Sequence, residues 1–271
     1  MGDKKELVVK SNRLVEASYR LTLVEQQIVL FAICKAREEK TGITSDTRVT
    51  ITALEFSRQF GTPGNTVYRD LKAAMSTLFE RHVVIHDIRP ETGKPRTTKT
   101  RWISSSSYID GDGTIQLKFA DDVIPFIARI EREFTQYRLE KIGNLSSVHA
   151  VRMYELLVQY IGLGKREFAI EWLRDTLDLI TEYPALKDLK KRVIDVSVTQ
   201  INTHTDITTS YTQRKTGRAV THLNFKIQAK EAPLSAPVKR PSLTRAYVEK
   251  HARVGETWEA ARERLRTERK K

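Results

Sequence analysis

Two histidines are the first candidates for chemistry, because their spacing could hold a metal ion. His82 and His86 flank the β-branched run Val83-Val84-Ile85, which predicts a β-strand. Residues four apart on a strand face the same side, so the two imidazoles could share one metal. No third ligand lies nearby in the sequence. We therefore expect two histidines on a solvated strand face and no metal site.

The usual catalytic and phosphate-binding motifs are missing. Gly162-Leu163-Gly164-Lys165 has the wrong spacing for a phosphate-binding loop and no following Ser or Thr to hold magnesium. Neither G-x-G-x-x-G nor G-x-S-x-G occurs. The His-hydrophobe-His motif that nicking enzymes combine with a nucleophilic Tyr is also absent. The single cysteine, Cys34, excludes an internal disulfide and a multi-thiolate zinc site. We predict a protein without catalysis, cofactor or metal.

The chemistry that remains is that of Lys and Arg. They number 47 against 34 Asp and Glu among 271 residues, a net charge of +13. Residues 232–271 carry 11 Lys and Arg against 5 Asp and Glu, so that +6 lies there and +7 on the rest. Such charge suits nucleic acid, an anionic membrane or an acidic protein. No apolar run reaches the roughly 20 residues of a membrane span, and the first residues are too polar for a signal peptide. We expect a cytoplasmic protein.

The first half of the chain is predicted to fold as helices followed by a β-hairpin, and these elements must position the charged side chains. Capping-box spacing at Thr22 and Glu25, and again at Thr52 and Glu55, predicts two helix starts. The predicted elements are a helix from Thr22 to about Ala36, a strand Arg48–Ile51, a helix from Thr52 to about Gly61, a third helix from the turn 62–65 to Leu78, a strand Val83–Ile88, a basic turn Pro90–Lys99 around Gly93, and a strand Trp102–Tyr108. This is the order of a winged helix-turn-helix.

The second half repeats that order. Its predicted elements are a helix Val148–Tyr160, a strand Phe168–Ile170, a helix Glu171–Leu179, a third helix Ala185–Asn202 with Leu186, Leu189, Val193 and Val196 on one face, and strands Asp206–Tyr211 and Val220–Ile227 around the turn 213–218. Similar residues recur at nearly constant offsets. Ile51 and Leu54 match Ile170 and Leu173 at 119, Arg69–Lys72 match Lys187–Lys190 at 118, and Gly93 matches Gly217 at 124. The agreement indicates an internal duplication.

The third helix of each half is the predicted recognition helix. A major groove about 12 Å wide admits one helix, whose exposed side supplies donors to phosphates and base edges. Each helix taken alone could equally be a solvated face rich in Lys, but two such helices, each followed by a basic hairpin, favour DNA. The predicted DNA-binding residues are Asn65, Tyr68, Arg69, Lys72, Lys94, Arg96, Lys99, Lys187, Lys190, Lys191, Arg192, Arg214, Lys215 and Arg218.

Several motifs resemble a known family. They are Lys10-Ser-Asn-Arg-Leu-Val-Glu-Ala-Ser-Tyr-Arg-Leu-Thr22, Phe134-Thr-Gln-Tyr-Arg-Leu139, Arg152-Met-Tyr-Glu-Leu-Leu157, Gln200-Ile-Asn-Thr203 and Lys215-Thr-Gly-Arg-Ala-Val-Thr-His-Leu-Asn-Phe225. Together they closely resemble iteron-binding replication initiators of theta-replicating plasmids, of the RepA/RepE type. The resemblance covers about residues 8–228.

The resemblance implies two tandem winged-helix domains that bind one direct repeat, with the C-terminal domain as the main major-groove reader. It places the family's basic cluster on Lys190, Lys191 and Arg192. It also implies monomers that initiate replication on double-stranded DNA repeats, and dimers that repress their own promoter on an inverted repeat. The dimer surface would lie in the first domain. Host replication proteins, such as DnaA, a helicase and chaperones, are further expected partners.

The predicted fold class is α+β, with two winged-helix domains related by internal duplication. We place them at residues 1–140 and 141–231, followed by a linker and basic tail at 232–271. Three prolines in Ala232–Ser242 predict an extended linker, and Thr257–Leu265 could form a helix. The tail could dock on a host replication protein or add non-specific DNA affinity, but a solvated tail without a specific partner is the favoured interpretation.

Three functions remain open. The leading one is a plasmid replication initiator that binds origin repeats without catalysis. A winged-helix transcriptional regulator with no role in initiation would use the same residues, and the third is an enzyme that nicks DNA through a Tyr. Several direct repeats of about 20 bp beside the gene would favour an initiator, and their absence would favour a regulator.

Overall fold

The computed structural model describes most of the chain up to Lys230 and a short piece of the tail. Residues 1–230 form one compact unit and residues 231–271 a second. The predicted linker Ala232–Ser242 lies outside the described residues. Of the predicted helix Thr257–Leu265, residues 258–259 and 261–263 are described and helical. The described residues are 6–38, 43–89, 92–109, 111–128, 130, 133–230, 258–259 and 261–263.

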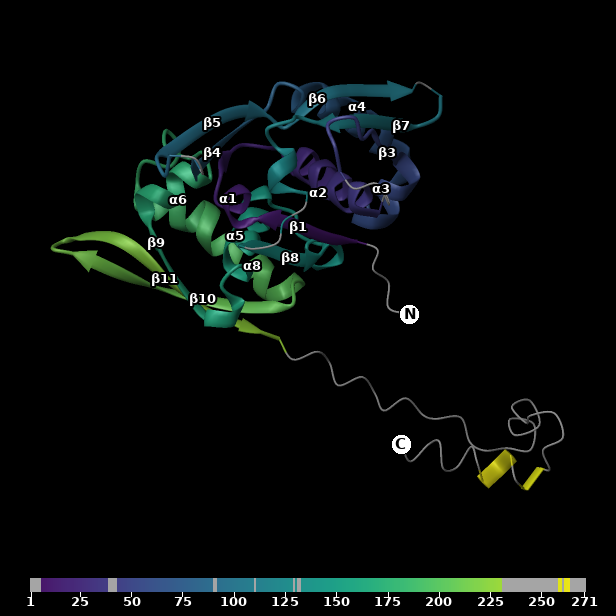
Figure 1. The fold of residues 1–271 in the computed structure, drawn as a ribbon. Helices are drawn as coiled ribbons and strands as arrows, with labels where there is room; N and C mark the ends of the chain where they lie inside the picture. The colour runs from purple at the N-terminus through teal and green to yellow at the C-terminus, as the bar shows by residue number, and fades with distance from the viewer. Residues whose placement is uncertain are drawn as a thin grey trace. The chain divides into compact units, whose positions relative to one another are not determined.

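The first half of the chain holds three small sheets packed with three main helices (Figure 1). Its elements are β1 (Leu7–Ser11), α1 (Asn12–Val15), β2 (Ser18–Tyr19), α2 (Leu23–Glu38), β3 (Val49–Thr52), α3 (Ala53–Phe60), α4 (Gly64–Leu78), β4 (His82–Ile88), β5 (Pro95–Arg101), β6 (Ile103–Ile109), β7 (Thr114–Phe119), the 3₁₀ turn η1 (Ile124–Phe126), β8 (Phe134–Arg138) and η2 (Leu139–Lys141). The three sheets are β1-β8, β2-β4-β5 and β3-β7-β6. Both predicted capping boxes are formed, because Glu25 and Glu55 each accept from the backbone N–H of the Thr three residues earlier.

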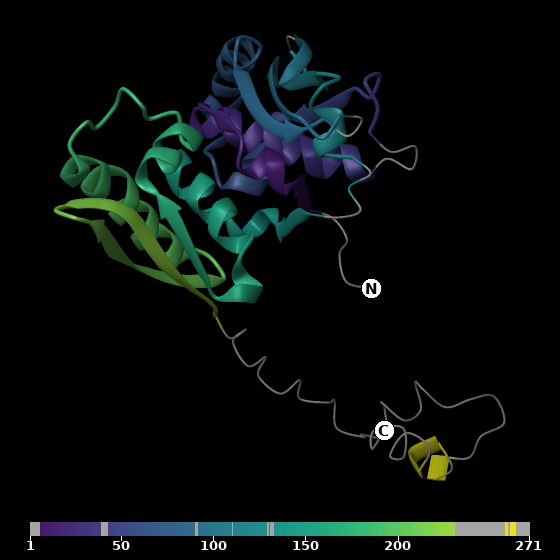
Figure 2. The ribbon, with the colours of Figure 1, turned by 60° about the vertical axis from the view of Figure 1, so that its left-hand side comes forward.

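The second half holds one sheet, whose long hairpin projects from the body (Figures 1 and 2). Its elements are α5 (Val148–Val158), η3 (Ile161–Leu163), β9 (Lys165–Ala169), α6 (Ile170–Thr176), α7 (Leu186–Leu189), a π-helical stretch η4 (Lys190–Ile194), α8 (Asp195–His204), β10 (Ile207–Thr216) and β11 (Ala219–Ala229). The predicted third helix thus exists as α7, η4 and α8 in direct succession. The two final strands are longer than predicted, so residues 213–216 pair as strand and the turn is reduced to Gly217-Arg218.

The two halves share one sheet topology, as an internal duplication predicts. The strand before the helices pairs with the last strand of the hairpin, which gives the order β3-β7-β6 in the first module and β9-β11-β10 in the second. In each module a helix pair follows that first strand, and the hairpin of the last two strands is the wing. The fold class of two winged-helix modules is confirmed.

The predicted wing of the first module is wrong. We expected strands Val83–Ile88 and Trp102–Tyr108 to pair around a turn at Gly93, but β4 pairs with β5, which occupies most of the predicted turn. The strand β6 pairs instead with β7, a strand that we did not predict. Trp102 lies fully buried between β5 and β6, with its ring centre 4.8 Å from that of Tyr19. Neighbouring strands can pair in more than one way, and here tertiary packing around Trp102 decides.

The residue-by-residue register of the duplication also needs correction. Leu54 is 60% exposed whereas its supposed counterpart Leu173 is fully buried. The residues that cap the equivalent helices are Thr52 and Ala169, an offset of 117, and this aligns Phe56 with Leu173. Gly93 lies in the β4–β5 hairpin, so it is not the counterpart of Gly217. The offset of 118 for the recognition helices aligns two buried leucines, Leu71 and Leu189.

A buried charge cluster joins the two modules. Lys10 of β1 and Arg152 of α5 are buried with one carboxylate, Glu155, to which Lys10 Nζ lies at 2.7 Å and Arg152 Nη1 at 3.8 Å. The hydroxyl of Tyr137 donates to Glu155 at 2.7 Å, and burial, with the nearby carboxylate, raises the Tyr137 pKa well above its ordinary value. Arg152 also donates to the Thr176 carbonyl of α6. The cluster therefore ties both modules to α5.

Three of the motifs that carry the family resemblance meet in this cluster. The first motif supplies Lys10 and Tyr19, the second supplies Tyr137, and the third supplies Arg152 and Glu155. The first two motifs also pair as the antiparallel strands β1 and β8. These motifs therefore serve the core and the junction of the modules, and the recognition helices carry the exposed basic residues.

Candidate DNA interface

The first recognition helix, α4, follows Pro63 and buries Val67, Leu71 and Met75 against the core. Two of its predicted DNA-binding side chains contact the wing of their own module. The Tyr68 hydroxyl donates to the Ile109 carbonyl at 3.2 Å, and Lys72 Nζ lies 4.0 Å from the centre of the Tyr108 ring. Tyr68 and Lys72 thus fasten the β6–β7 wing to the helix.

The other two predicted residues of α4 differ in environment. Arg69 is exposed, and its Nε lies 3.3 Å from the Asp70 carboxylate. The negative charge of Asp70 therefore offsets the positive charge that Arg69 adds to the exposed side of α4. Asn65 lies in the first turn of the helix, but its side chain is outside the described residues. The first recognition helix therefore offers DNA less unpaired positive charge than its sequence suggested.

Lys94, Arg96 and Lys99 lie on the β4–β5 hairpin and not on the wing. Arg96 Nε donates to Asp87 at 2.8 Å, and this hydrogen bond holds the pKa of the Asp87 carboxyl below its ordinary value. Lys94 and Lys99 are exposed. The hairpin also carries His82 and His86 on its exposed side, and His86 Nδ1 lies 3.0 Å from Thr97 Oγ1.

The second recognition helix carries the densest basic group. Lys187, Lys191 and Arg192 are exposed and Lys190 is half-buried. Among the described residues, these four side chains form no hydrogen bond or ion pair. Val196, predicted to be buried, is 37% exposed, while Ile194 and Ser197 are buried instead. The π-helical stretch explains this error, because the sequence argument assumed about 100° per residue throughout.

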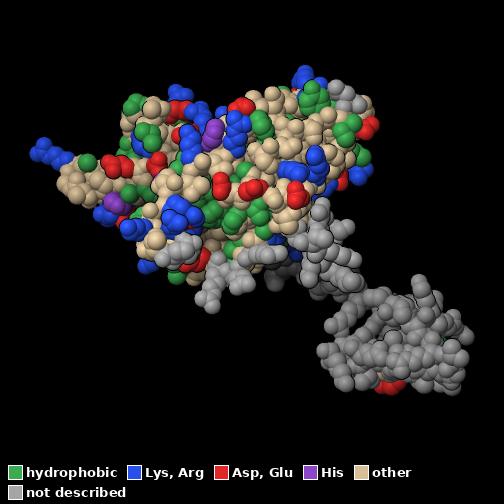
Figure 3. Space-filling model, turned by 45° about the horizontal axis from the view of Figure 1, so that its top comes forward, with side chains coloured by type: hydrophobic (Ala, Val, Ile, Leu, Met, Phe, Trp, Pro, Cys, Tyr) green, Lys and Arg blue, Asp and Glu red, His purple; other side chains and the backbone are tan. Residues whose placement is uncertain are grey.

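The second wing is long, and Lys and Arg side chains gather at its end (Figure 3). Lys215 and Arg218 are exposed beside the turn at Gly217, whose φ of +62° suits glycine. Arg214 instead makes two hydrogen bonds of 2.8 Å to Glu167 of β9, which lower the pKa of the Glu167 carboxyl. The wing is tied to its recognition helix by the Tyr211 hydroxyl, which donates to Asp195 at 2.6 Å.

The structure thus brings each recognition helix together with its own wing, and the two modules differ in charge. The first wing, missed in the sequence, has the exposed turn residue Asp112, and its Lys118 lies 3.3 Å from Asp46. The signal that could have found it is Asp112-Gly113 before the alternating Ile115, Leu117 and Phe119, a pattern typical of a hairpin.

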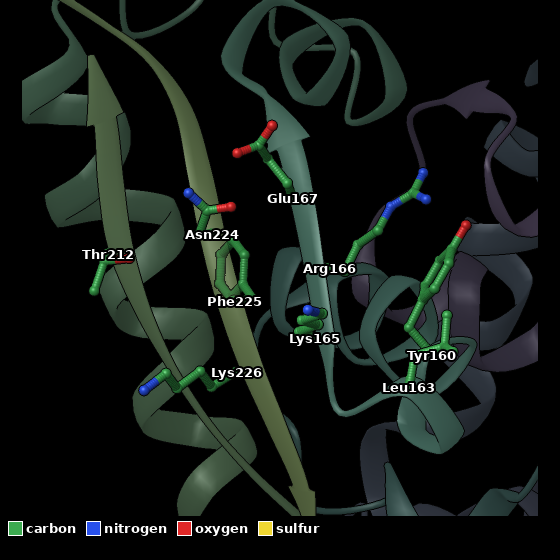
Figure 4. Close-up of a pocket in the computed structure, with 9 residues that line it drawn as sticks. All are labelled: Tyr160, Leu163, Lys165, Arg166, Glu167, Thr212, Asn224, Phe225 and Lys226. Carbon is green, nitrogen blue, oxygen red and sulfur yellow. The ribbon is translucent and has the colours of Figure 1, made fainter.

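A second basic surface lies on the outer face of the second sheet. Lys165 of β9 and Lys226 of β11 are direct cross-strand neighbours beside a pocket of about 490 Å³ (Figure 4). Tyr160 and Phe225 supply its apolar wall. These lysines belong to neither recognition helix, and no pattern in the sequence singled them out.

None of the described helices combines the length and the apolar composition that a membrane crossing requires. Among the described residues, no three His, Cys, Asp or Glu side chains gather as metal ligands would.

Comparison with known proteins places the chain in a family. Residues 7–158 match the family model described as initiator replication protein, WH1, and residues 169–227 match that of initiator Rep protein, WH2. An uncharacterised 27.6 kDa protein of Escherichia coli is 22% identical over 241 residues, which cover 86% of this chain and 98% of that protein. The crystal structure of Pi initiator protein in complex with iteron DNA has a TM-score of 0.68 and 18% identity, and the match covers 85% of this chain and 100% of that chain. Because the WH1 model alone spans more than half of the sequence, the chain belongs to the family of initiator replication proteins.

Proposed function

We propose that this protein initiates plasmid replication by binding direct repeats, or iterons, at the origin through both winged-helix modules. The observation that carries the proposal is the second recognition helix, where Lys187, Lys191 and Arg192 are exposed without an acidic partner among the described residues. The likeness in fold to an initiator bound to iteron DNA supports the same function. The second module would read bases, and the first would mainly position the protein on the phosphate backbone.

We further propose two assembly states, a cellular location and a set of host partners. As a monomer the protein would bind repeats, and as a dimer it would repress its own promoter at an inverted repeat. It would act in the cytoplasm with host replication proteins such as DnaA, a helicase and chaperones, and without catalysis, cofactor or metal. The domain limits of 1–140, 141–231 and 232–271 stay predictions.

Two experiments test the proposal. In footprinting of the DNA beside the gene, the protein should protect several direct repeats of about 20 bp, each one covering two turns of the major groove. Protection of a single operator alone would contradict a role in initiation. Supercoiled plasmid incubated with the protein and Mg²⁺ or Mn²⁺ should stay supercoiled, whereas relaxed circles would reveal a nicking enzyme.

The affinity for a repeat should fall steeply with salt. If the two modules neutralise about six to eight phosphates, the logarithm of the association constant should change with the logarithm of salt concentration with a slope of about −5 to −7. Fluorescence anisotropy with a labelled duplex between low and moderate salt measures this slope. A slope shallower than about −2 would contradict phosphate contacts from both modules.

Removal of residues 232–271 should leave repeat recognition intact. Both winged-helix modules lie within the described residues up to Lys230, and the removed segment carries +6 of the charge. We expect weaker binding to scrambled DNA and unchanged discrimination in favour of the repeat. If the truncated protein no longer distinguishes repeat from scrambled DNA, the tail is part of the recognition surface.

A further inference from the structure

The recognition helix of the second module contains a π-turn at its basic cluster. Residues Lys190–Ile194 are π-helical, and the backbone N–H of Asp195 donates to the carbonyl of Lys190, five residues back. The helix is α-helical on both sides of this stretch. Single π-turns of this kind are rare and occur frequently at functional sites.

Comparison of the two recognition helices shows that the π-turn is one inserted residue. In α4 the buried positions Leu71, Met75 and Leu78 follow one another at intervals of four and three. In the second module the buried Leu189, Ile194 and Ser197 follow at intervals of five and three. The offset between the modules therefore changes from 118 at Leu71 and Leu189 to 119 at Met75 and Ile194.

The inserted residue changes whether the Arg192 side chain faces the core or the solvent. Arg192 is the third residue after Leu189, and the third residue after Leu71 in the regular helix is Ala74, which is buried. A regular helix would direct the Arg192 guanidinium toward the core, where an unpaired charge is costly. With the π-turn, Arg192 is exposed while both Val193 and Ile194 are buried.

We propose that the π-turn is a specificity device that turns Arg192 out of the buried register and sets it beside Lys187 and Lys191 on the DNA-facing side. This inference rests on the proposed function, in which this helix enters a major groove. Arg192 supplies a planar fork that hydrogen-bonds a guanine edge through two donors, whereas Lys offers a point charge. The π-turn also sets the angle between the residues before and after it, so the whole face depends on the inserted residue.

Deletion of Lys190 tests the device. Without Lys190, Ile194 follows Leu189 at the regular interval of four, and Val193 takes the place of the buried Ala74, so the helix should fold as a regular α-helix. Arg192 then takes the place of the exposed Ala73, so it stays at the surface, and what changes is its position relative to Lys187, which is one residue closer along the helix. Lys190→Ala is the matched control, because it removes the same side chain and charge but keeps the π-turn. Full-length proteins are compared on a duplex that the unaltered chain selects from a randomised pool, and on a scrambled duplex.

We expect the deletion to lower the preference for the selected duplex about tenfold or more relative to Lys190→Ala, with binding to scrambled DNA equal within about threefold. Equal preference in the two variants would overturn the inference. Loss of the helical circular dichroism signal in the deletion variant alone would contradict the regular-helix register on which it depends. If the unaltered chain selects no duplex, the proposed function itself fails, and the inference with it.

Arg192→Lys gives a second test with the π-turn intact and the charge retained. Preference should relax at one base pair of the selected duplex, while the salt dependence stays unchanged, because a phosphate contact needs only the charge. Unchanged preference at every base pair would show that the Arg192 fork reads no base and would overturn the inference.

Discussion

Glu155→Gln is expected to lower the free energy of unfolding by about 3–5 kcal/mol. Glu155 is fully buried and is the carboxylate that faces two buried cations, Lys10 and Arg152. A neutral amide would leave both positive charges without compensation in a region from which water is excluded. Urea unfolding, followed by tryptophan fluorescence to which the buried Trp102 contributes, measures the change.

Lys10→Met is the matched control for this prediction. The cluster holds two cations for one anion, so removal of the Lys10 ammonium leaves the Arg152–Glu155 pair balanced. Met also replaces the buried Lys stem with an apolar chain of similar length, and we expect a loss below about 1.5 kcal/mol. A loss in Lys10→Met as large as that in Glu155→Gln would contradict the account of the cluster as a charge balance.

Lys190→Ala with Lys191→Ala should cost more specific affinity than Arg69→Ala with Lys72→Ala. The second helix presents its lysines without an ion pair among the described residues, whereas Arg69 lies beside Asp70 and Lys72 lies over Tyr108. At about 1–3 kcal/mol for each base contact, the first double variant should bind the repeat about 30-fold more weakly or worse. Binding to the repeat, and to duplexes with single base changes, at two salt concentrations measures both affinity and preference.

Lys165→Ala with Lys226→Ala removes the same charge from the second module at a site off the recognition helix. These two lysines are cross-strand neighbours on the outer face of the sheet, and we expect their loss to change specific affinity less than threefold. Equal weakening by this control and by the Lys190 and Lys191 variant would mean that DNA senses only total charge. If the two recognition-helix variants weaken all duplexes alike, their residues bind phosphates only.

The contrast between the modules gives these predictions a structural basis. The second wing ends in exposed Lys215 and Arg218, while the first wing exposes Asp112 at its turn. An acidic turn is repelled by phosphates, and a basic one is attracted to them. The duplicated modules therefore share a topology and differ in the charge of their wings, which agrees with a division between base reading in the second module and positioning in the first.

Local rules determined the helices and their starts. The capping boxes at Thr22 and Thr52 formed as predicted, and α4 buries Val67, Leu71, Met75 and Leu78. Helix starts and buried helix faces depend on residues three or four positions apart, so a short segment of sequence is enough to predict them. The motifs that carry the family resemblance also predicted two winged-helix modules, and the family models confirm them.

Only the tertiary structure decided which strands pair, which arginines are neutralised and where the second recognition helix departs from regularity. The polar strand β5 pairs with its neighbour β4, whereas the unpredicted β7 pairs both with its neighbour β6 and with β3, far earlier in the sequence, so the sheet of the first wing depends on a distant partner. Arg96 and Arg214 meet carboxylates across strands, contacts that no spacing along the chain specifies. The π-turn places Ile194 and Ser197 in the core instead of Val196, and a prediction that assumes a constant helical period cannot anticipate that change.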